Sequence, residues 1–328
     1  MEGPVLWIKD LKVWYRIYGG FLKVIDGIEM KVLLGERVGL VGETGCGKTT
    51  TMKAALHLLP PNGKVPNGQI FLDGKDISRI SKSELRKIRN SGIAMIFQDP
   101  TSALNPVFTV GEQLIEAIAN GKEGKSSRQE NLKDAVSILE KVLMPDPQRI
   151  MRNFPFQLSG GMRQRVCIAM ALSRAKKLLI ADEPTTSLDV TIQAQILDLI
   201  QKIVVENNLS LILITHSLGI ARQMTDRIYV MYAGTIVETA PTSVFYEEPL
   251  HPYTKGLFDS VPRLTGEGFA DGIPGRIPNY LNPPLGCRFQ PRCGKSLPIC
   301  SQKRPPLLEI SKDHWVSCFL YEGKGGGK

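Results

Sequence analysis

The sequence predicts an α/β fold built around a largely parallel sheet. Short apolar runs alternate with helical patterns from residue 5 to about residue 260, which is typical of parallel strands joined by helices. Several of these runs are continuously apolar, as expected for strands covered on both faces. We expect strands at residues 6–15, 28–34, 37–41, 93–97, 177–181, 209–214 and 227–232, and helices at 48–58, 161–175 and 190–207.

Two further regions depart from this alternation. Strand patterns stop at about residues 98–157, where two helical patterns are joined by a polar stretch, so we expect a helical insert subdomain there. The core domain is expected to cover residues 1–264. In residues 265–328 Pro and Gly become frequent and periodicity fades, which predicts a small, irregular, Cys-rich C-terminal module with little core of its own.

Composition limits the class of protein. The chain has 328 residues, of which 42% are hydrophobic and 22% charged, and no run of 18 apolar residues could span a membrane. The first ten residues lack the basic and then apolar pattern of a secretory signal, so we expect a cytosolic chain. The formal charge of +9 suits nucleic acid, anionic lipid or nucleotide phosphates without choosing among them.

A glycine-rich loop separates the strand expected at 37–41 from the helix expected at 48–58. Its spacing, G-x-x-x-x-G-K-[ST], is that of a P-loop. Backbone N–H groups of such a loop turn toward phosphate oxygens, and the helix N-terminus adds its dipole. We expect Lys48 to reach the β- and γ-phosphates and Thr49 to bind Mg²⁺, with Cys46 as a spacer. The predicted nucleotide-binding residues are Gly42, Glu43, Thr44, Gly45, Cys46, Gly47, Lys48, Thr49 and Thr50.

Two acidic residues, Asp182 and Glu183, end a second apolar strand. Carboxylates in such a place are costly unless a cation meets them, and nucleotides bind at the carboxyl ends of parallel strands. We therefore expect Asp182 to hold Mg²⁺ through its water shell and Glu183 to act as general base on the attacking water. A helix N-cap explains Asp189, which precedes the helix at 190–207, but not the two strand-end acids.

A serine and two glycines precede another predicted helix, in the string Leu158-Ser159-Gly160-Gly161-Met162. They make a second anion-binding helix N-terminus, and two phosphate sites so far apart in sequence suggest that each serves a different nucleotide. This string resembles the signature of ABC transporter ATPases, usually written LSGGQ, and lies about 20 residues before the acidic strand, as in that family. Met162 replaces the usual Gln, a form familiar among peptide-importer subunits.

Other positions resemble the ABC ATPase family one by one, from about residue 5 to residue 260. Gln98 resembles the Q-loop glutamine, which implies contacts with Mg²⁺, water and the membrane subunits. Residues 187–189, which end in Asp189, resemble the D-loop, and His216 resembles the switch histidine that contacts the γ-phosphate. Tyr15 resembles the aromatic residue that stacks on adenine. Trp14 and Tyr18 are alternatives for that role.

The resemblance implies a mechanism and partners. Two ATPase domains, either two copies or two sister chains, would meet head to tail, so that the P-loop of one faces Ser159, Gly160 and Gly161 of the other. ATP would close the pair, and hydrolysis at Glu183 would release it. This cycle would drive two transmembrane permease subunits through the helical insert, which places the chain peripherally at the cytoplasmic face of the cell membrane. An extracytoplasmic peptide-binding protein would act with them.

Four of the six cysteines crowd into the C-terminal module. Cys287, Cys293, Cys300 and Cys318 have the spacing C-x5-C-x6-C-x17-C, which fits neither the close pairs of structural zinc nor the ferredoxin run. The strings around His251 and Cys287 resemble the C-terminal extension of oligopeptide/dipeptide transporter ATPases, some of which hold a [4Fe–4S] cluster there. We expect the four thiolates to hold such a cluster as a structural staple, with zinc, disulfides or free thiols as alternatives.

These patterns predict an ATPase that uses ATP and Mg²⁺ to power ABC import of dipeptides or oligopeptides. Nickel chelates and sugars are alternative cargoes, because cargo choice belongs to other subunits. A soluble ABC ATPase that acts on nucleic acid is the alternative of another class, and the basic charge allows it. We expect no nucleic-acid partner, since the chain has neither a second cassette nor a long coiled-coil insert. A P-loop kinase or GTPase would leave Ser159 and His216 without a role.

Overall fold

The computed structural model describes residues 3–90, 92–122, 124, 126–186, 188–261 and 272–323. The chain divides into two compact units. The helical unit comprises Met1–Val5, Leu33–Glu36 and Arg79–Leu213, and the P-loop unit comprises Leu6–Val32, Arg37–Ser78 and Ile214–Lys328. The predicted boundary between residues 264 and 265 lies outside the described residues.

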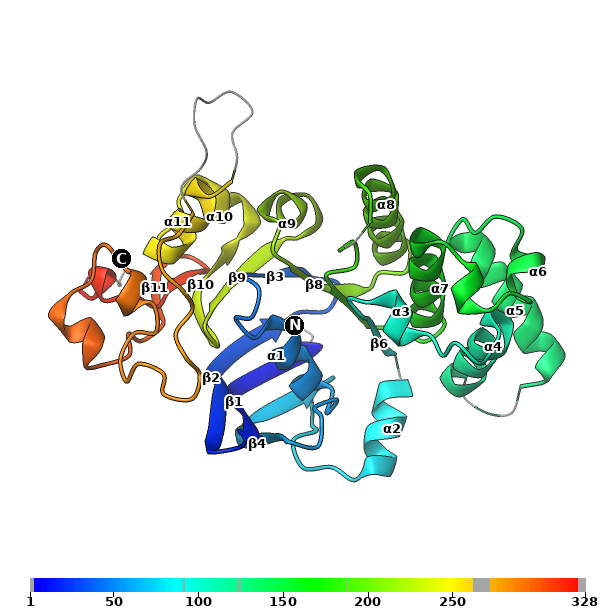
Figure 1. Cartoon of the computed structure of the whole chain (residues 1–328), viewed down its shortest axis with the longest axis horizontal. Coiled ribbons are helices and arrows are strands. Elements are labelled where there is room, and N and C mark those ends of the chain that lie inside the picture. The colour runs from blue at the N-terminus through cyan, green and yellow to red at the C-terminus, as the bar shows by residue number, and fades with distance from the viewer. Residues whose placement is uncertain are drawn as a thin grey trace. The chain divides into compact units, whose positions relative to one another are not determined.

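A mixed sheet forms the centre of the P-loop unit, with its strands in the order β11-β12-β10-β9-β3 (Figure 1). β3 and β9 run parallel, and the other neighbours are antiparallel. The continuous apolar runs explain where β3 and β9 lie, because Val38, Leu40 and Val230 are fully buried and such strands need cover on both faces. The bounds are β3 (Arg37–Val41), β9 (Arg227–Tyr232), β10 (Thr235–Pro241), β11 (Leu308–Ser311) and β12 (His314–Val316).

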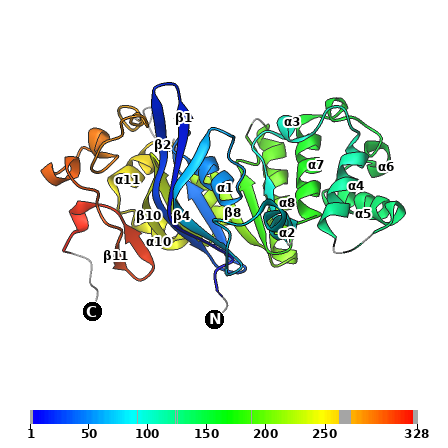
Figure 2. The ribbon, with the colours of Figure 1, turned by 90° about the horizontal axis from the view of Figure 1, so that it is seen from below.

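An antiparallel sheet of four strands, in the order β2-β1-β4-β5, completes this unit. Figure 2 shows β1, β2 and β4 side by side. Tyr18 and Gly19 make the turn between β1 and β2, and a connection this short permits only antiparallel pairing. The prediction that residues 6–15 and 28–34 join a parallel sheet is therefore wrong in orientation. The bounds are β1 (Leu6–Ile17), β2 (Gly20–Val32), β4 (Gly63–Leu72) and β5 (Lys75–Asp76).

The helical unit contains the parallel pair β6 (Ile93–Ile96) and β7 (Leu178–Asp182). No described residue between these two strands belongs to a strand, as the strand-free pattern predicts. Helices α4, α5 and α7 pack against one another there. Capping boxes at Thr109 and Ser127 fix the starts of α4 and α5. The helical bounds are α2 (Lys82–Asn90), α3 (Pro100–Ala103), α4 (Val110–Gly121), α5 (Arg128–Lys141), α6 (Pro147–Ile150), η1 (Pro155–Gln157), α7 (Gly160–Leu172) and α8 (Val190–Glu206).

The described C-terminal segment, residues 272–323, is mostly irregular. Its hairpin β11–β12 adds to the edge of β10, where Trp315 pairs with Thr239. Phe289 packs against Tyr232 and Tyr253, with ring centroids 5.0 and 5.4 Å away. The segment therefore shares the core of the P-loop unit.

The remaining helices and strands have the following bounds: α1 (Lys48–Ala55), β8 (Ser210–Thr215), α9 (Leu218–Met224), α10 (Thr242–Glu247), α11 (Pro252–Asp259), η2 (Gln290–Arg292), η3 (Pro298–Ser301) and η4 (Phe319–Tyr321).

Among the residues described, no helix is both long and apolar enough to cross a membrane.

Candidate functional site

The predicted P-loop joins β3 to α1, in the strand–loop–helix setting that the motif needs. Two of its glycines have no room for a side chain. A Cβ on Gly42 would lie 2.2 Å from the carbonyl oxygen of Met231, and one on Gly47 would lie 2.6 Å from Cδ1 of Ile25. Gly47 also has a φ of 110°, which side chains disfavour. The loop backbone can therefore approach a phosphate without intervening side chains.

Lys48 is held back over the loop. Its Nζ donates hydrogen bonds to the carbonyl oxygens of Gly42, at 2.7 Å, and Glu43, at 3.1 Å. The residue is 5% exposed, so its ammonium group is buried against the loop backbone. Cys46 is fully buried, and burial raises the pKa of its thiol. A protonated, buried thiol agrees with a spacer and not with a nucleophile.

Three side chains that sequence analysis did not predict contact this loop. Arg292 forms a two-pronged ion pair with Glu43, Tyr253 accepts a hydrogen bond from the Glu43 amide, and Tyr280 donates one to the Gly45 carbonyl oxygen. The partners are separated by 249, 210 and 235 positions respectively. No local pattern could have identified them.

The acidic strand end lies in the helical unit. Asp182 ends β7 and is 1% exposed. Glu183 follows with a φ of 44°, an uncommon conformation that turns its carboxylate off the strand direction. Nε2 of Gln98 donates to Oε2 of Glu183 at 3.2 Å, and the Thr186 hydroxyl donates to the same oxygen at 3.0 Å. The structure thus brings together Gln98 and Glu183, 85 positions apart.

The predicted signature also lies in the helical unit. Ser159 caps α7, and its Oγ accepts a hydrogen bond from the Met162 amide at 3.4 Å. Ser159 and Gly160 are exposed. A Cβ on Gly160 would meet no atom closer than Cδ2 of Leu188, at 3.6 Å. Ser159 and Gly160 therefore leave this helix start accessible, and anion binding there stays a prediction.

The remaining predicted nucleotide residues occupy the following places. Asp189 caps α8, as expected, and accepts from the Ile192 amide at 2.9 Å. Ser187 lies outside the described residues. His216 follows β8 directly and is exposed. Tyr15 is half-buried near the end of β1, opposite Gly63 of β4.

The two alternatives to Tyr15 lie in different surroundings. Trp14 faces Phe21, with ring centroids 6.0 Å apart. Tyr18 is fully exposed on the hairpin turn. Adjacent residues of a strand point to opposite faces, so Trp14 and Tyr15 cannot serve the same face of the sheet.

The four C-terminal cysteines form no disulfide. The Cys287 amide donates to the Cys300 carbonyl oxygen at 2.8 Å. Burial raises the pKa of Cys287 to about 11, and the charges of Cys300 and Cys318 add to this effect. Four cysteines match an iron–sulfur cluster in number and in kind of ligand, whereas the raised pKa of Cys287 disfavours the thiolate form that would bind it. However, within the described residues no three His, Cys, Asp or Glu side chains lie in a group that could hold a metal ion.

His314, which stands beside Trp315 in sequence, has a partner of its own. Its Nε2 lies 2.9 Å from Oε1 of Glu238, and both residues are buried. Glu238 also accepts hydrogen bonds from the amides of Leu250 and His251. His314 thus belongs to a buried polar network that joins β12 to β10 and not to a ligand set with the cysteines.

Comparisons with known proteins identify the class of protein to which this chain belongs. Residues 25–186 match the family described as ABC transporter, and residues 237–300 match the one described as oligopeptide/dipeptide transporter, C-terminal region. Among solved structures, the fold resembles the dimeric ATP-binding cassette MJ0796 in a post-hydrolysis state bound to ADP and Pi. That likeness has a TM-score of 0.65 at 26% identity and covers 72% of this chain and 98% of that one. The chain is thus an ATPase with the ABC fold.

Curated relatives define the family more closely. The dipeptide transport ATP-binding protein DppD of Bacillus subtilis is 45% identical over 320 residues, 97% of this chain and 95% of the relative. The oligopeptide transport ATP-binding protein OppD of the same organism is 44% identical and covers 96% of this chain and 88% of the relative. The chain belongs to this family of peptide-transport ATP-binding proteins, as the sequence predicted.

Proposed function

We propose that this chain hydrolyses ATP to power the import of dipeptides or oligopeptides. The similarity to peptide-transport ATP-binding proteins carries this proposal, because it extends over 97% of the chain and includes the C-terminal segment. Nickel, sugar and nucleic-acid functions have no comparable support among these relatives.

The P-loop supplies the phosphate-binding half of the proposed mechanism. Lys48 would exchange the carbonyl oxygens of Gly42 and Glu43 for the β- and γ-phosphates of ATP. Thr49 and Asp182 offer hydroxyl and carboxylate oxygens, the donors that Mg²⁺ prefers. When bound, Mg²⁺ neutralises charge on the phosphate oxygens. We assign adenine stacking to Tyr15 and γ-phosphate contact to His216.

Glu183 is the proposed general base. Two neutral donors, from Gln98 and Thr186, hold the same carboxylate oxygen. They fix the orientation of the carboxylate without neutralising it, which leaves it able to accept a proton from the attacking water. The glutamine would also sense whether the site is filled, since a ligand that draws Gln98 away would free the carboxylate.

A second ATPase chain completes the proposed cycle. Ser159, Gly160 and Gly161 would bind the γ-phosphate of ATP held on the P-loop of the partner, and Asp189 would lie near that contact. MJ0796 was solved as a dimer, which supports pairing. We further propose that the helices between β6 and β7 dock two transmembrane permease subunits, and that the chain works at the cytoplasmic face of the membrane beside an extracytoplasmic peptide-binding protein.

The proposed function is tested in vesicles that contain the permease subunits and the peptide-binding protein. Glu183→Gln should lower peptide-stimulated ATP hydrolysis by roughly 10²–10⁴-fold while ATP binding persists. Glu206→Gln, which removes an exposed carboxylate from the same unit, should change nothing. Hydrolysis that RNA or DNA stimulates, and peptide does not, would contradict the proposal.

We also propose a [4Fe–4S] cluster on Cys287, Cys293, Cys300 and Cys318. The four cysteine sulfurs would be its ligands, and the cluster would act as a structural staple of the C-terminal segment. Iron, sulfide and zinc should be measured on anaerobically purified protein. About four irons and four sulfides per chain, with absorption near 400 nm, support the cluster, and zinc alone or no metal refutes it.

A further inference from the structure

Arg292 of the C-terminal segment pairs with Glu43 of the P-loop through both terminal nitrogens of its guanidinium group. Nη1 and Nη2 of Arg292 contact the two carboxylate oxygens of Glu43 at 2.8 and 3.1 Å. The Arg292 side chain is 5% exposed and that of Glu43 is 27% exposed. A two-pronged pair of this kind fixes orientation as well as distance.

Arg292 is itself fixed on the C-terminal side. Its Nε donates to the Pro274 carbonyl oxygen at 2.8 Å, and Nη2 donates to that of Ile273 at 2.9 Å. The guanidinium group also lies 5.7 Å from the centre of the Tyr232 ring. The hydrogen bonds with Glu43 raise the pKa of Arg292, so its charge is permanent. The contact therefore joins the P-loop to the backbone at Ile273 and Pro274.

Glu43 is the residue through which this contact can reach the phosphate site. Its carboxylate binds Arg292, its amide binds the Tyr253 hydroxyl, and its carbonyl oxygen binds Lys48. The Tyr280 hydroxyl holds the Gly45 carbonyl oxygen two residues further on, at 2.8 Å. The contacts of Arg292, Tyr253 and Tyr280 come from outside the loop and limit how its backbone can turn.

We propose that Arg292 is a positioning residue for ATP binding: through Glu43, the C-terminal segment sets the conformation of the P-loop. This inference rests on the proposed function, in which the loop binds ATP. It gives that segment a role at the nucleotide site in addition to any metal it carries. Because Cys293 follows Arg292 directly and its amide bonds to Gln290 within the same turn, changes at that cysteine would be transmitted to the loop.

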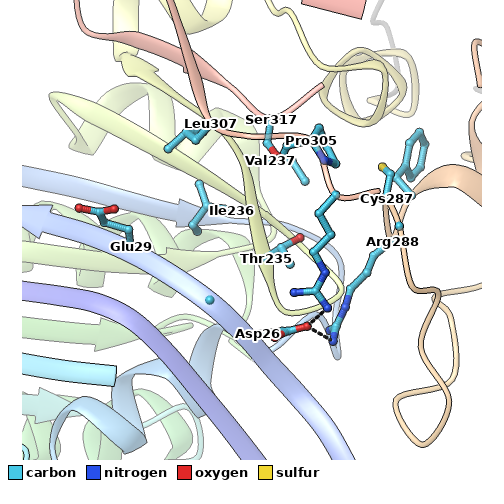
Figure 3. A pocket seen from close by; sticks show the side chains of 14 residues that line it. Asp26, Glu29, Thr235, Ile236, Val237, Cys287, Arg288, Pro305, Leu307 and Ser317 are labelled. Carbon is cyan, nitrogen blue, oxygen red and sulfur yellow. Dashed lines mark hydrogen bonds and ion pairs between the residues drawn. The ribbon is translucent and has the colours of Figure 1, made fainter. Parts of the chain in front are cut away.

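The same segment offers a matched control. Arg304 and Arg288 both pair with Asp26 of β2, beside a cavity of about 240 Å³ (Figure 3). Arg304 is thus a C-terminal arginine bound to a carboxylate of the core, like Arg292, but its carboxylate lies outside the P-loop. Arg304→Gln removes the same charge from a more exposed side chain, 44% against 5%, and leaves Asp26 paired with Arg288.

The test measures ATP affinity of the full chain with Mg²⁺, by displacement of a fluorescent nucleotide, together with KM and kcat of the assembled transporter. Arg292→Gln should raise the dissociation constant and KM for ATP roughly tenfold and change kcat much less. The free energy of one hydrogen bond to a charged group corresponds to a factor of about ten in affinity. Arg292→Lys should recover part of the loss, because it keeps the charge but not the fork. Arg304→Gln should bind ATP like the wild type.

Two further variants guard against misfolding and separate this inference from the proposed function. Tyr280→Phe removes one hydroxyl and should weaken ATP binding by a smaller factor. The double variant of Glu43→Gln with Arg292→Gln should bind ATP no more weakly than either single variant. Unchanged affinity in Arg292→Gln, or additive losses in the double variant, would overturn the inference. A wild-type chain that binds no ATP would instead overturn the proposed function.

Discussion

The P-loop and the signature segment (residues 158–162) both place backbone N–H groups at the start of a helix, but they are stabilised differently. The P-loop is stabilised by residues distant in sequence, including Tyr253, Tyr280 and Arg292. The signature segment is capped locally, by the Ser159 hydroxyl three residues from its partner amide, and its residues Ser159 and Gly160 are exposed. In the proposed function, the P-loop binds its own ATP and has this outside support, whereas the signature segment would meet ATP on another chain and stays open.

The largest expected effect tests the P-loop side of this comparison. Lys48→Ala removes the only side chain of the motif that can place a positive charge on the phosphates, and should lower the hydrolysis rate by roughly 10²–10³-fold. ATP binding by the isolated chain should weaken as well. Steady-state hydrolysis and a nucleotide titration on the same preparation measure both. Binding that stays at the wild-type level would contradict the assignment of this loop.

A substitution in the signature segment should separate hydrolysis from binding. Gly160→Glu places a negative charge where a phosphate is expected, and the space around this glycine accepts a side chain. An acidic residue in the first turn also suits the helix dipole, so the chain should fold. Hydrolysis in the assembled transporter should fall by roughly 10²-fold, while the isolated chain binds ATP normally. Weaker binding by the isolated chain would indicate that this segment serves its own nucleotide.

A smaller effect is expected on the free energy of unfolding when an alanine replaces a glycine in each of the two segments. Gly47→Ala creates a 2.6 Å contact with Ile25 and forces a side chain into a left-handed conformation. The free energy of unfolding should fall by about 3 kcal/mol. Gly160→Ala, with no neighbour nearer than 3.6 Å, should change it by less than about 0.5 kcal/mol. Urea unfolding of both variants measures the difference, and equal losses would show that the two segments are equally constrained.

The smallest expected effect is a loss of unfolding free energy at acid pH, caused by His251 at the start of the helix that carries Tyr253. His251 caps α11 by accepting the Tyr253 amide at 3.0 Å, and burial lowers its pKa from 6.5 to about 4. The unfolded chain therefore binds a proton that the folded chain does not, and stability falls as the pH drops from 6.5 toward 4. Between pH 6.5 and 5 the loss should be about 2 kcal/mol.

His251→Asn is the matched variant for the acid effect. It keeps an acceptor at the helix start but does not titrate, so its unfolding free energy should depend less on pH by that amount. Carboxylates that titrate in both proteins cancel in the difference. The same pH dependence in both would exclude His251 as the cause.

Local patterns predicted the parts of this protein that depend on neighbouring residues. The P-loop between β3 and α1, the strand-free stretch before β7 and the N-caps Ser159 and Asp189 all follow from short strings of sequence. The antiparallel sheet was missed, because residues 20–27 have no strong strand pattern and the turn at Tyr18 and Gly19 was not recognised. Once that hairpin forms, its direction is fixed.

The sequence by itself predicted which residues carry phosphate chemistry, since glycines, a lysine and a serine at fixed spacing act through the backbone next to them. It also determined the family, through motifs in order along the chain. Only the tertiary structure decided what holds those motifs in place. The pair of Arg292 with Glu43 and that of Gln98 with Glu183 join residues 249 and 85 positions apart. Such pairs depend on how the strands and the C-terminal segment pack, because side-chain contacts between distant residues leave no periodic trace in the sequence.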